Sequence, residues 1–360
     1  MRSLQSVLVT GGAGFIGSNF VRFLLSQADF TGTVINADRL TYSGNLRSLI
    51  DVDKRYGGTR YFFERLDICD SIGLAAAFEA HHIDTVVNFA AESHVDRSIL
   101  GPREFVRTNI EGTFTLLEAA RAAWGDRRDV LFHHVSTDEV YGSLGPTGSF
   151  GEESRYDPRS PYAATKAAAD HLVRSYWCTY GLPTTLSNCS NNYGPYQFPE
   201  KVIPLMILNM LEDRPLPIYG DGKNVRDWLF VEDHCSALWS ILRNGRMGES
   251  YNVGGENEWE NNQLVNVLCE KVATAQGRPK DTYKRLVRYV TDRPGHDRRY
   301  SIDCGKIKQE LGWRRSVDFD GGLERTVRWY LDNAAWVAET KSGEYQDWIR
   351  KNYSTRPAKQ

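Results

Sequence analysis

Apolar residues in the first half of the chain follow two alternating patterns. Short runs rich in β-branched residues predict strands at 7–10, 33–37, 61–63, 85–89, 130–135 and 184–189. Stretches with apolar positions at helical spacing lie between them, at 16–27, 72–82, 103–124 and 161–180. Strands that alternate with helices predict right-handed βαβ units. The expected fold is therefore α/β, a doubly wound parallel sheet of Rossmann type with helices on both faces.

The pattern changes after about residue 190, where proline and glycine become frequent. We expect residues 1–190 to form the Rossmann-type domain. Residues 191–345 are expected to form mainly a smaller mixed α/β domain, with some segments returning to the first, and residues 346–360 a tail.

Composition narrows the classes of function. The chain has 360 residues, a net charge of -2 and 41% hydrophobic residues, which gives no indication of nucleic-acid or membrane-surface binding. No apolar run approaches the ~18 residues that span a bilayer, and the first residues lack the long apolar stretch of a signal peptide. The six cysteines are scattered, without a Cys-x-x-Cys pair. We expect reduced thiols, a cytoplasmic location and no metal site.

The first strand runs into the glycine-rich turn Gly11-Gly12-Ala13-Gly14-Phe15-Ile16-Gly17, and a helix begins within this turn. Such glycines allow a tight turn and a close approach of backbone to pyrophosphate, and the helix N-terminus offers free N–H groups. Asp38 ends the second strand, about 20 residues later, where an acid binds the adenosine ribose. Asp38 would repel a 2′-phosphate and favours NAD over NADP, whereas Arg39 beside it is able to accept that phosphate.

Two further strand ends reach the edge where ligands bind in open α/β sheets. Asp67 and Ile68 follow the third strand, at the expected level of the adenine. Ala90, Ala91, Glu92 and Ser93 follow the fourth strand, near the expected pyrophosphate and nicotinamide ribose.

Tyr162 and Lys166 lie one turn apart near the start of the predicted helix 161–180. Their i, i+4 spacing places both side chains on one helix face. A nearby ammonium favours phenolate, so we expect Lys166 to lower the pKa of Tyr162 and make it a base near neutral pH.

The glycine turn together with Tyr162 and Lys166 resembles the extended short-chain dehydrogenase/reductase family, which modifies nucleotide sugars. The segment 136–142, Ser-Thr-Asp-Glu-Val-Tyr-Gly, resembles more specifically the dTDP-glucose 4,6-dehydratases of that family. Residues 90–98, 191–201 and 293–297 carry the same resemblance, which runs from the first strand to about residue 330.

The resemblance implies an NAD-dependent hydro-lyase that converts dTDP-glucose to dTDP-4-keto-6-deoxyglucose. NAD oxidises carbon 4, water is eliminated across carbons 5 and 6, and the hydride returns to carbon 6. Tyr162 would take the 4-hydroxyl proton while Thr137 supports the 4-oxygen, and Glu139 would remove the carbon-5 proton. Asp138 would protonate the 6-hydroxyl, which requires that burial and the neighbouring carboxylate keep Asp138 protonated.

The two acids need a special backbone. Consecutive strand residues point to opposite faces, so Asp138 and Glu139 reach one sugar only if the chain leaves strand geometry there. We therefore predict a turn at these residues. The alternative is that both are solvated acids in a loop after the strand.

The resemblance also assigns binding residues. The cofactor-binding residues are expected to be Gly11, Gly14, Phe15, Ile16, Gly17, Asp38, Arg39, Leu40, Thr41, Asp67, Ile68, Ala90, Ala91, Glu92, Ser93, Thr108, Tyr162, Lys166 and Asn192. The substrate-binding residues are expected to be His94, Thr137, Asn191, Glu200, Lys201, Val202, Pro217, Tyr219, Arg226, Asn261, Arg293 and His296. Arg226 and Arg293 suit a diphosphate because guanidinium matches phosphate oxygens in a fork. Tyr219 would stack on the pyrimidine, or be a core aromatic, and Asn262 is an alternative to Asn261.

Small and apolar residues occupy more than one face of the predicted helices 103–124 and 161–180. One face must cover the sheet, and the other is expected to form a four-helix homodimer interface, with a second buried face in the monomer as the alternative. Alternative functions are an epimerase or decarboxylase of the same family, or a non-catalytic NAD-binding scaffold. The pair Asp138-Glu139 argues against the first two, and the presence of Tyr162 and Lys166 against the third. The sequence leaves the nucleotide base open among thymidine, uridine and cytidine.

Overall fold

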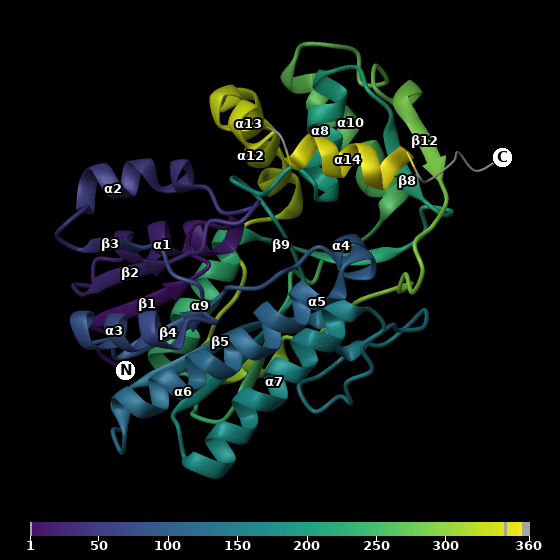
Figure 1. The fold of residues 1–360 in the computed structure, drawn as a ribbon. Helices are drawn as coiled ribbons and strands as arrows, with labels where there is room; N and C mark the ends of the chain where they lie inside the picture. Colours follow the sequence, from purple (N-terminus) through teal and green to yellow (C-terminus); the bar gives the residue numbers. More distant parts are fainter. Residues whose placement is uncertain (1, 342–343, 355–360) are drawn as a thin grey trace.

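The computed structural model describes residues 2–341 and 344–354. Residues 342–343 of the expected second domain and 355–360 of the expected tail lie outside the described residues. A large sheet with helices on both faces forms one part of the molecule, and a smaller group of helices and short strands sits at one edge of the sheet (Figure 1).

The large sheet is parallel throughout and confirms the predicted doubly wound fold. Within the described residues its seven strands lie in the order β10-β6-β5-β4-β1-β2-β3. The strands are β1 (Ser6–Thr10), β2 (Thr33–Ala37), β3 (Tyr61–Glu64), β4 (Thr85–Asn88), β5 (Leu131–Thr137), β6 (Thr184–Cys189) and β10 (Ser250–Val253). The first six match the predicted runs, and β10 comes from the second half of the chain. The order reverses beside β1, which makes a switch point at the carboxyl edge.

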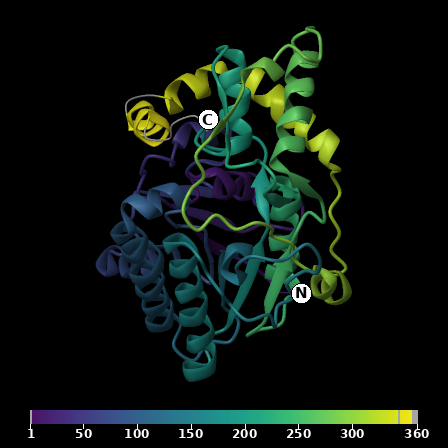
Figure 2. The same cartoon turned by 90° about the vertical axis from the view of Figure 1, so that its right-hand side faces the viewer.

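Helices pack on the two faces through separate apolar clusters. Helices α1 (Phe15–Ser26) and α9 (Val231–Asn244) cover one face, where Phe20 and Leu24 meet Leu238 and Leu242. Helices α3 (Ser71–His81), α6 (Thr113–Trp124) and α7 (Pro161–Tyr180) cover the other. Helix α9 and strand β10 return to this large sheet from the second half of the chain, and the smaller region lies above the sheet in Figure 2.

The predicted helix 103–124 is divided in the structure. It consists of α5 (Pro102–Phe105), wider π-helical turns at Val106–Gly112, and α6. A Cβ on Gly112 would lie 2.6 Å from the Ile68 side chain, so glycine permits the close approach of this helix to the strand ends. Such π turns re-aim side chains and are frequent at functional sites.

The smaller region has its own apolar core around Tyr193, Leu264 and Leu323. It contains α8 (Val202–Leu211), α10 (Asn261–Ala275), α12 (Phe319–Asp332) and α13 (Ala334–Thr340). Strands β7 (Asn191–Tyr193), β9 (Val225–Phe230) and β11 (Glu258–Glu260) form one small sheet, and β8 (Leu216–Tyr219) pairs with β12 (Val287–Val290).

Shorter helices complete the described chain. These are α2 (Ile50–Tyr56), α4 (Val95–Leu100), α11 (Gly305–Leu311), α14 (Glu344–Ser354) and the 3-10 helices Leu46–Leu49, Asp138–Tyr141 and Lys284–Leu286. In the part of the chain that the structure describes, none of the helices has the length and apolar character needed to cross a membrane.

Candidate active site

The turn after β1 brings backbone close to backbone. Gly11 has φ +67, and a Cβ there would lie 2.9 Å from Ala90 Cα. A Cβ on Gly17 would lie 2.3 Å from the Gly11 carbonyl oxygen. Gly14 is the N-cap of α1 and makes no side-chain cap hydrogen bond, so the first N–H groups of the helix are not capped by this residue. The glycines therefore shape a backbone cradle that suits a phosphate group.

Asp38 is fixed beside this cradle. Its carboxylate accepts hydrogen bonds from the Ala13 N–H at 3.0 Å and the Leu40 N–H at 2.8 Å. Burial raises the pKa of Asp38, and the two backbone donors oppose that shift. The guanidinium of Arg39 pairs with Asp67 at 3.1 Å. Arg39 is thus already engaged by an acid beside the expected ribose position.

One continuous cavity follows the carboxyl edge of the sheet from the cradle to α7. It is lined by almost all the expected cofactor residues, namely Gly11, Gly14, Phe15, Ile16, Gly17, Asp38, Arg39, Thr41, Asp67, Ile68, Ala90, Ala91, Glu92, Ser93, Thr108, Tyr162, Lys166 and Asn192. Leu40 does not line it. The buried Thr108 hydroxyl has no hydrogen-bond partner among the described residues. A long polar ligand of dinucleotide shape fits this cradle and its donors.

Asn109, which the sequence analysis missed, does not line this cavity but holds Glu92, which does. Its side chain accepts from the Glu92 N–H at 2.9 Å and donates to the Glu92 carbonyl at 3.0 Å. It also donates to the Thr165 hydroxyl at 2.9 Å, which ties the π turns to α7. An asparagine inside a helical pattern carried no local signal for this bridge, because its partners are distant in sequence.

The predicted turn at Asp138 and Glu139 is confirmed. Strand β5 ends at Thr137, and a 3-10 helix covers Asp138–Tyr141. The Thr137 hydroxyl accepts from the Glu139 N–H at 3.3 Å and lies 3.4 Å from Asp138 Oδ1. Both acids line the first cavity, and Asp138 is only 2% exposed. The alternative of two solvated loop acids is therefore wrong.

The surroundings of Asp138 and Glu139 shift the pKa values of their carboxyls by different amounts. Burial raises the pKa of Asp138 well above its ordinary value, and the charges of Glu139 and Asp227 raise it further. Burial also raises the pKa of Glu139, but Arg293, Arg226 and Lys201 act against that shift. Asp138 Oδ2 is buried with no hydrogen-bond partner among the described residues. Asp138 is thus the group of the pair that keeps its proton.

The expected lowering of the Tyr162 pKa is wrong for this structure. Burial and then the charge of Glu139 raise the pKa of Tyr162 well above its ordinary value. Lys166 Nζ instead donates to the Val135 carbonyl at 2.8 Å and lies 3.2 Å from His134 Nε2. Strand β5 engages this ammonium, and the low dielectric penalises the phenolate more than sequence spacing suggested.

A second cavity opens beside the first in the smaller region. Its walls include the expected substrate residues His94, Asn191, Glu200, Lys201, Val202, Pro217, Tyr219, Arg226, Asn261, Arg293 and His296, whereas Thr137 lines the first cavity. Glu139, Asn191, Glu200 and Lys201 line both cavities. A ligand in the second cavity therefore extends toward the two acids.

The two expected diphosphate ligands are held in different ways. Arg226 donates to the Asp297 carbonyl at 2.9 Å, and its guanidinium lies 4.2 Å from the Tyr300 ring centroid. Arg293 lies 3.7 Å from Asp96, and its buried Nε has no hydrogen-bond partner among the described residues. Buried cations with unused donors suit an anionic ligand.

Contacts around the rest of this second cavity distinguish Asn261 from Asn262 as the residue that lines it. Asn261 lines it, whereas Asn262 donates to the Asp221 carbonyl at 3.0 Å. The Tyr219 hydroxyl donates to Asp96 at 2.9 Å. Glu200 accepts from Arg97 Nε at 3.0 Å, a partner that the sequence analysis missed although it lies in the segment 90–98.

In residues 2–341 and 344–354, no cluster of three or more histidine, cysteine or acidic side chains is arranged to hold a metal ion.

Comparisons with known proteins agree with this geometry. Residues 8–326 match the family model described as GDP-mannose 4,6 dehydratase. The chain is 52% identical to a curated dTDP-glucose 4,6-dehydratase of Salmonella typhimurium, over 98% of this chain and 100% of that protein. It is 54% identical to a probable dTDP-glucose 4,6-dehydratase of Sinorhizobium fredii, over 92% of this chain and 94% of that protein.

Solved structures show the same likeness. The structure of DesIV, a dTDP-glucose 4,6-dehydratase from Streptomyces venezuelae with NAD and TYD bound, is 48% identical with a TM-score of 0.84, covering 92% of this chain and 98% of that one. A UDP-glucose 4-epimerase from Thermotoga maritima with UDP-glucose is more distant, at 29% identity and a TM-score of 0.81, covering 92% of this chain and 100% of that one.

Proposed function

The chain belongs to the family described as GDP-mannose 4,6 dehydratase, and from this membership we propose how its residues divide the reaction among them. The chain is an NAD-dependent hydro-lyase that converts dTDP-glucose to dTDP-4-keto-6-deoxyglucose. The observation that carries the division of roles is the buried, proton-retaining Asp138 next to Glu139, where the two cavities meet. An epimerase or a decarboxylase has no need of a general acid beside a general base.

The cofactor is NAD. In the proposed arrangement, the cradle at Gly11–Gly17 holds its diphosphate and Asp38 its adenosine ribose. When bound, NAD supplies a cationic nicotinamide ring that accepts the hydride from carbon 4 and returns it to carbon 6. Tyr162 and Lys166 line the end of the same cavity, beside the proposed sugar position.

Oxidation requires a base at the 4-hydroxyl. Tyr162, as phenolate, takes this proton, and the Thr137 hydroxyl supports the 4-oxygen. Because burial and Glu139 raise the pKa of Tyr162, the phenolate needs a cation nearby. Lys166, buried on the same face of α7, supplies that charge from the chain itself.

Elimination uses the two acids in opposite forms. Glu139 removes the carbon-5 proton as a carboxylate, with Arg293, Arg226 and Lys201 favouring its charged form. Asp138 gives its proton to the departing 6-hydroxyl, so that water leaves instead of hydroxide. Glu139 then returns its proton to carbon 5 when the hydride reaches carbon 6.

Each turnover leaves one proton on Tyr162 and removes one from Asp138. The Thr137 hydroxyl lies 3.4 Å from Asp138 Oδ1, and Thr137 is also an influence that lowers the pKa of Tyr162. A hydroxyl that accepts from the phenol and donates to the carboxylate moves one net proton between them. In this scheme, Thr137 moves the proton from Tyr162 to Asp138 and resets the site.

The finer organisation is also part of the proposal. Residues 1–190 would bind NAD and residues 191–345 mainly the sugar nucleotide, with α9 and β10 returning to the first unit and residues 346–360 as a tail. All six cysteines are free, which suits a reducing cytoplasm. A homodimer would form through the outer faces of α5, α6 and α7.

The direct test incubates purified protein with dTDP-, UDP- and CDP-glucose and follows the 4-keto-6-deoxy product by its absorbance in alkali. We expect product from dTDP-glucose without net consumption of added NAD, and none from Tyr162→Phe protein. Product from none of the three nucleotides would contradict the assigned reaction, and faster turnover of UDP- or CDP-glucose would contradict the thymidine preference.

A further inference from the structure

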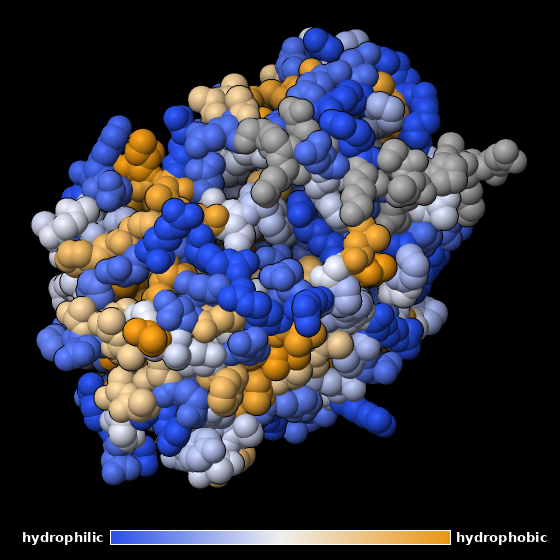
Figure 3. All heavy atoms as spheres, in the orientation of Figure 1, coloured by the Kyte–Doolittle hydropathy of each residue, from blue (hydrophilic) through white to orange (hydrophobic). Residues whose placement is uncertain are grey.

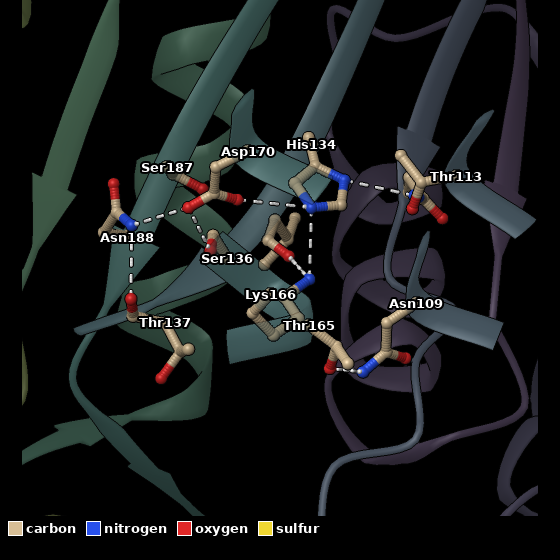
Figure 4. Close-up of polar contacts among 12 residues, drawn as sticks. Asn109, Thr113, His134, Ser136, Thr137, Thr165, Lys166, Asp170, Ser187 and Asn188 are labelled. Carbon is tan, nitrogen blue, oxygen red and sulfur yellow. Dashed lines mark hydrogen bonds and ion pairs between the residues drawn. The ribbon is translucent and has the colours of Figure 1, made fainter. Parts of the chain in front are cut away.

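A buried polar network surrounds the side chain of Lys166 (Figure 4). Asp170 follows Lys166 by one turn of α7 and is 0% exposed. The ring of His134, on β5, stands between the two side chains. Its Nε2 lies 3.2 Å from Lys166 Nζ and 3.5 Å from Asp170 Oδ1. None of the steps assigned above uses Asp170.

The other carboxylate oxygen of Asp170 is held by three donors. Oδ2 accepts from the Ser136 hydroxyl at 2.8 Å, the Tyr156 hydroxyl at 3.0 Å and Asn188 Nδ2 at 3.5 Å. Asn188 also donates to the Thr137 carbonyl at 3.2 Å. The carboxylate is therefore fixed to the end of the strand that carries Thr137 and Asp138.

The other carboxylate oxygen of Asp170, Oδ1, lacks such hydrogen-bond donors among the residues that the structure describes. It is buried and has no hydrogen bond from the described residues, only the ion-pair contact to His134. A buried carboxylate oxygen without a donor is costly unless a positive charge lies nearby. Lys166, across the His134 ring, is that charge.

The charge of Lys166 needs the same support. Burial lowers the pKa of Lys166, and Asp170 is the largest influence that raises it, followed by Cys189 on β6. His134 does not help, because burial and then Lys166 lower its pKa well below the ordinary value and keep it neutral. Burial raises the pKa of Asp170 to about 6, so Asp170 is charged at neutral pH.

We propose that Asp170 is a positioning residue for Lys166, keeping its ammonium charged and directed along β5 through the His134 ring. Asp170 lines neither cavity, so it acts on the site only through the residues that it contacts. The inference rests on the proposed role of Lys166 in oxidation. Asp170 extends the face of α7 that carries Tyr162 and Lys166, with one helical turn between successive residues.

The experiment titrates Lys166 directly, by NMR of full-length NAD-loaded protein labelled at lysine Cε. The Lys166 signal is assigned by its loss in Lys166→Met protein. In Asp170→Asn protein we expect the acid dissociation constant of Lys166 to rise about tenfold or more. Asp84→Asn is the matched control. It also removes a buried carboxylate, but one that accepts from the Gln5 and Ser6 N–H groups at the opposite edge of the sheet.

Turnover provides a second readout. We expect Asp170→Asn to lower kcat most at alkaline pH, where Lys166 loses its proton first, and to leave KM for dTDP-glucose unchanged. An unchanged Lys166 titration, or an equal change in Asp84→Asn protein, would overturn the inference. Full turnover by Lys166→Met protein would instead overturn the role of Lys166.

A second variant covers the case in which Asp170→Asn protein does not fold. Ser136→Ala combined with Tyr156→Phe keeps the carboxylate and removes two donors that lower its pKa. Asp170 then takes up a proton at higher pH, and the Lys166 titration should move in the same direction as in Asp170→Asn protein. No movement in this double variant would contradict the inference equally.

Discussion

Asp138 and Glu139 are neighbours in sequence with opposite tasks, and their environments explain how one pair of carboxyls divides the work. The 3-10 turn aims both at the cavity. Burial is the largest influence on each, but only Glu139 has Arg293 as the next influence after burial, acting to lower its pKa. The proton therefore remains on Asp138, the residue that must donate it.

Single substitutions should separate the two roles in deuterated water. Asp138→Asn removes the acid, so elimination should fall by about 10²–10⁴-fold while Glu139 continues to exchange the carbon-5 proton. Glu139→Gln should abolish both elimination and exchange. The measurement is deuterium at carbon 5 of the recovered nucleotide sugar, by mass spectrometry. Exchange that is lost as completely in Asp138→Asn protein as in Glu139→Gln protein would refute the assignment.

For single residues, the sequence predicted which side chains belong to the site better than it predicted their pKa values. The turn at Asp138 followed from the need to bring two consecutive side chains to one sugar, which is a local constraint. The raised pKa of Tyr162 did not follow, because it depends on burial and on Glu139, which folding brings near from another element. Asp170 had a local signal, its i+4 spacing from Lys166, but its function depends on His134.

Among the elements, β5 carries a histidine on each of its faces. His134 faces Lys166, whereas His133 contacts the Thr185 and Ser187 hydroxyls of β6 at 2.8 and 3.1 Å. Burial lowers the pKa of His133 to about 3. The unfolded chain takes up a proton at this residue as pH falls through about 6.5, while the folded chain does not. Stability from neutral His133 is therefore lost progressively below that pH.

The size of this loss is measurable by urea unfolding at about pH 7.5 and about pH 5. We expect His133 to contribute about 2 kcal/mol of additional destabilisation at the lower pH, so His133→Gln protein should lose about 2 kcal/mol less than the parent chain on acidification. His171→Gln, at an exposed position, is the control and should follow the parent chain. Equal acid sensitivity of the parent chain and the His133 variant would show that His133 titrates normally.

Helix α14 lies against the wall of the second cavity. The Arg97 guanidinium stands 4.4 Å from the Trp348 ring centroid and 3.8 Å from that of Tyr42. The Trp348 ring also lies 5.4 Å from that of His94, and Arg97 holds Glu200. His94 and Glu200 both line the cavity, so α14 supports two of its side chains from behind.

Trp348→Ala should therefore weaken substrate binding without removing a catalytic group. The loss of the cation–π and ring contacts is worth about 1 kcal/mol or more, so we expect KM for dTDP-glucose to rise several-fold to about tenfold, with little change in kcat. Asp347→Ala, at an exposed position of the same helix, should leave both constants unchanged. A fall in kcat with constant KM would mean that α14 acts on the chemistry instead.

Helices and strands were predicted well when their pattern lies in their own residues, and poorly when they depend on contacts with residues far away in sequence. Strands β1 to β6 and helix α7 were predicted because each repeats a period in its own residues. Strand β10 pairs with β6 although β7, α8, β8, β9 and α9 lie between them in the chain, and its register, Ser250 with Leu186, has no local signature. The division of 103–124 by π turns depends on the approach of Gly112 to Ile68, which is likewise a tertiary contact.

For the whole molecule, apolar side chains remain on the side away from the sheet core. Leu100, Val106, Phe114 and Tyr180 are 57%, 50%, 47% and 51% exposed. They lie on or beside α4, the π turns, α6 and α7, and apolar side chains gather along the α5–α6 run in Figure 3. A second buried face within the monomer does not account for these residues, and pairing with another copy would cover them.

The oligomeric state tests this surface. In sedimentation velocity we expect the parent chain to behave as two copies and Phe114→Arg protein as one, because a buried unpaired charge at the centre of an apolar interface costs several kcal/mol. Ile72→Arg is the matched control, since Ile72 is 82% exposed on α3 and lies outside the proposed interface. Tyr162 and Lys166 start the helix that would be paired, so the separated Phe114 variant should also bind NAD more weakly if pairing steadies α7. A Phe114→Arg protein that remains dimeric, or an Ile72→Arg protein that dissociates, would place the contact elsewhere.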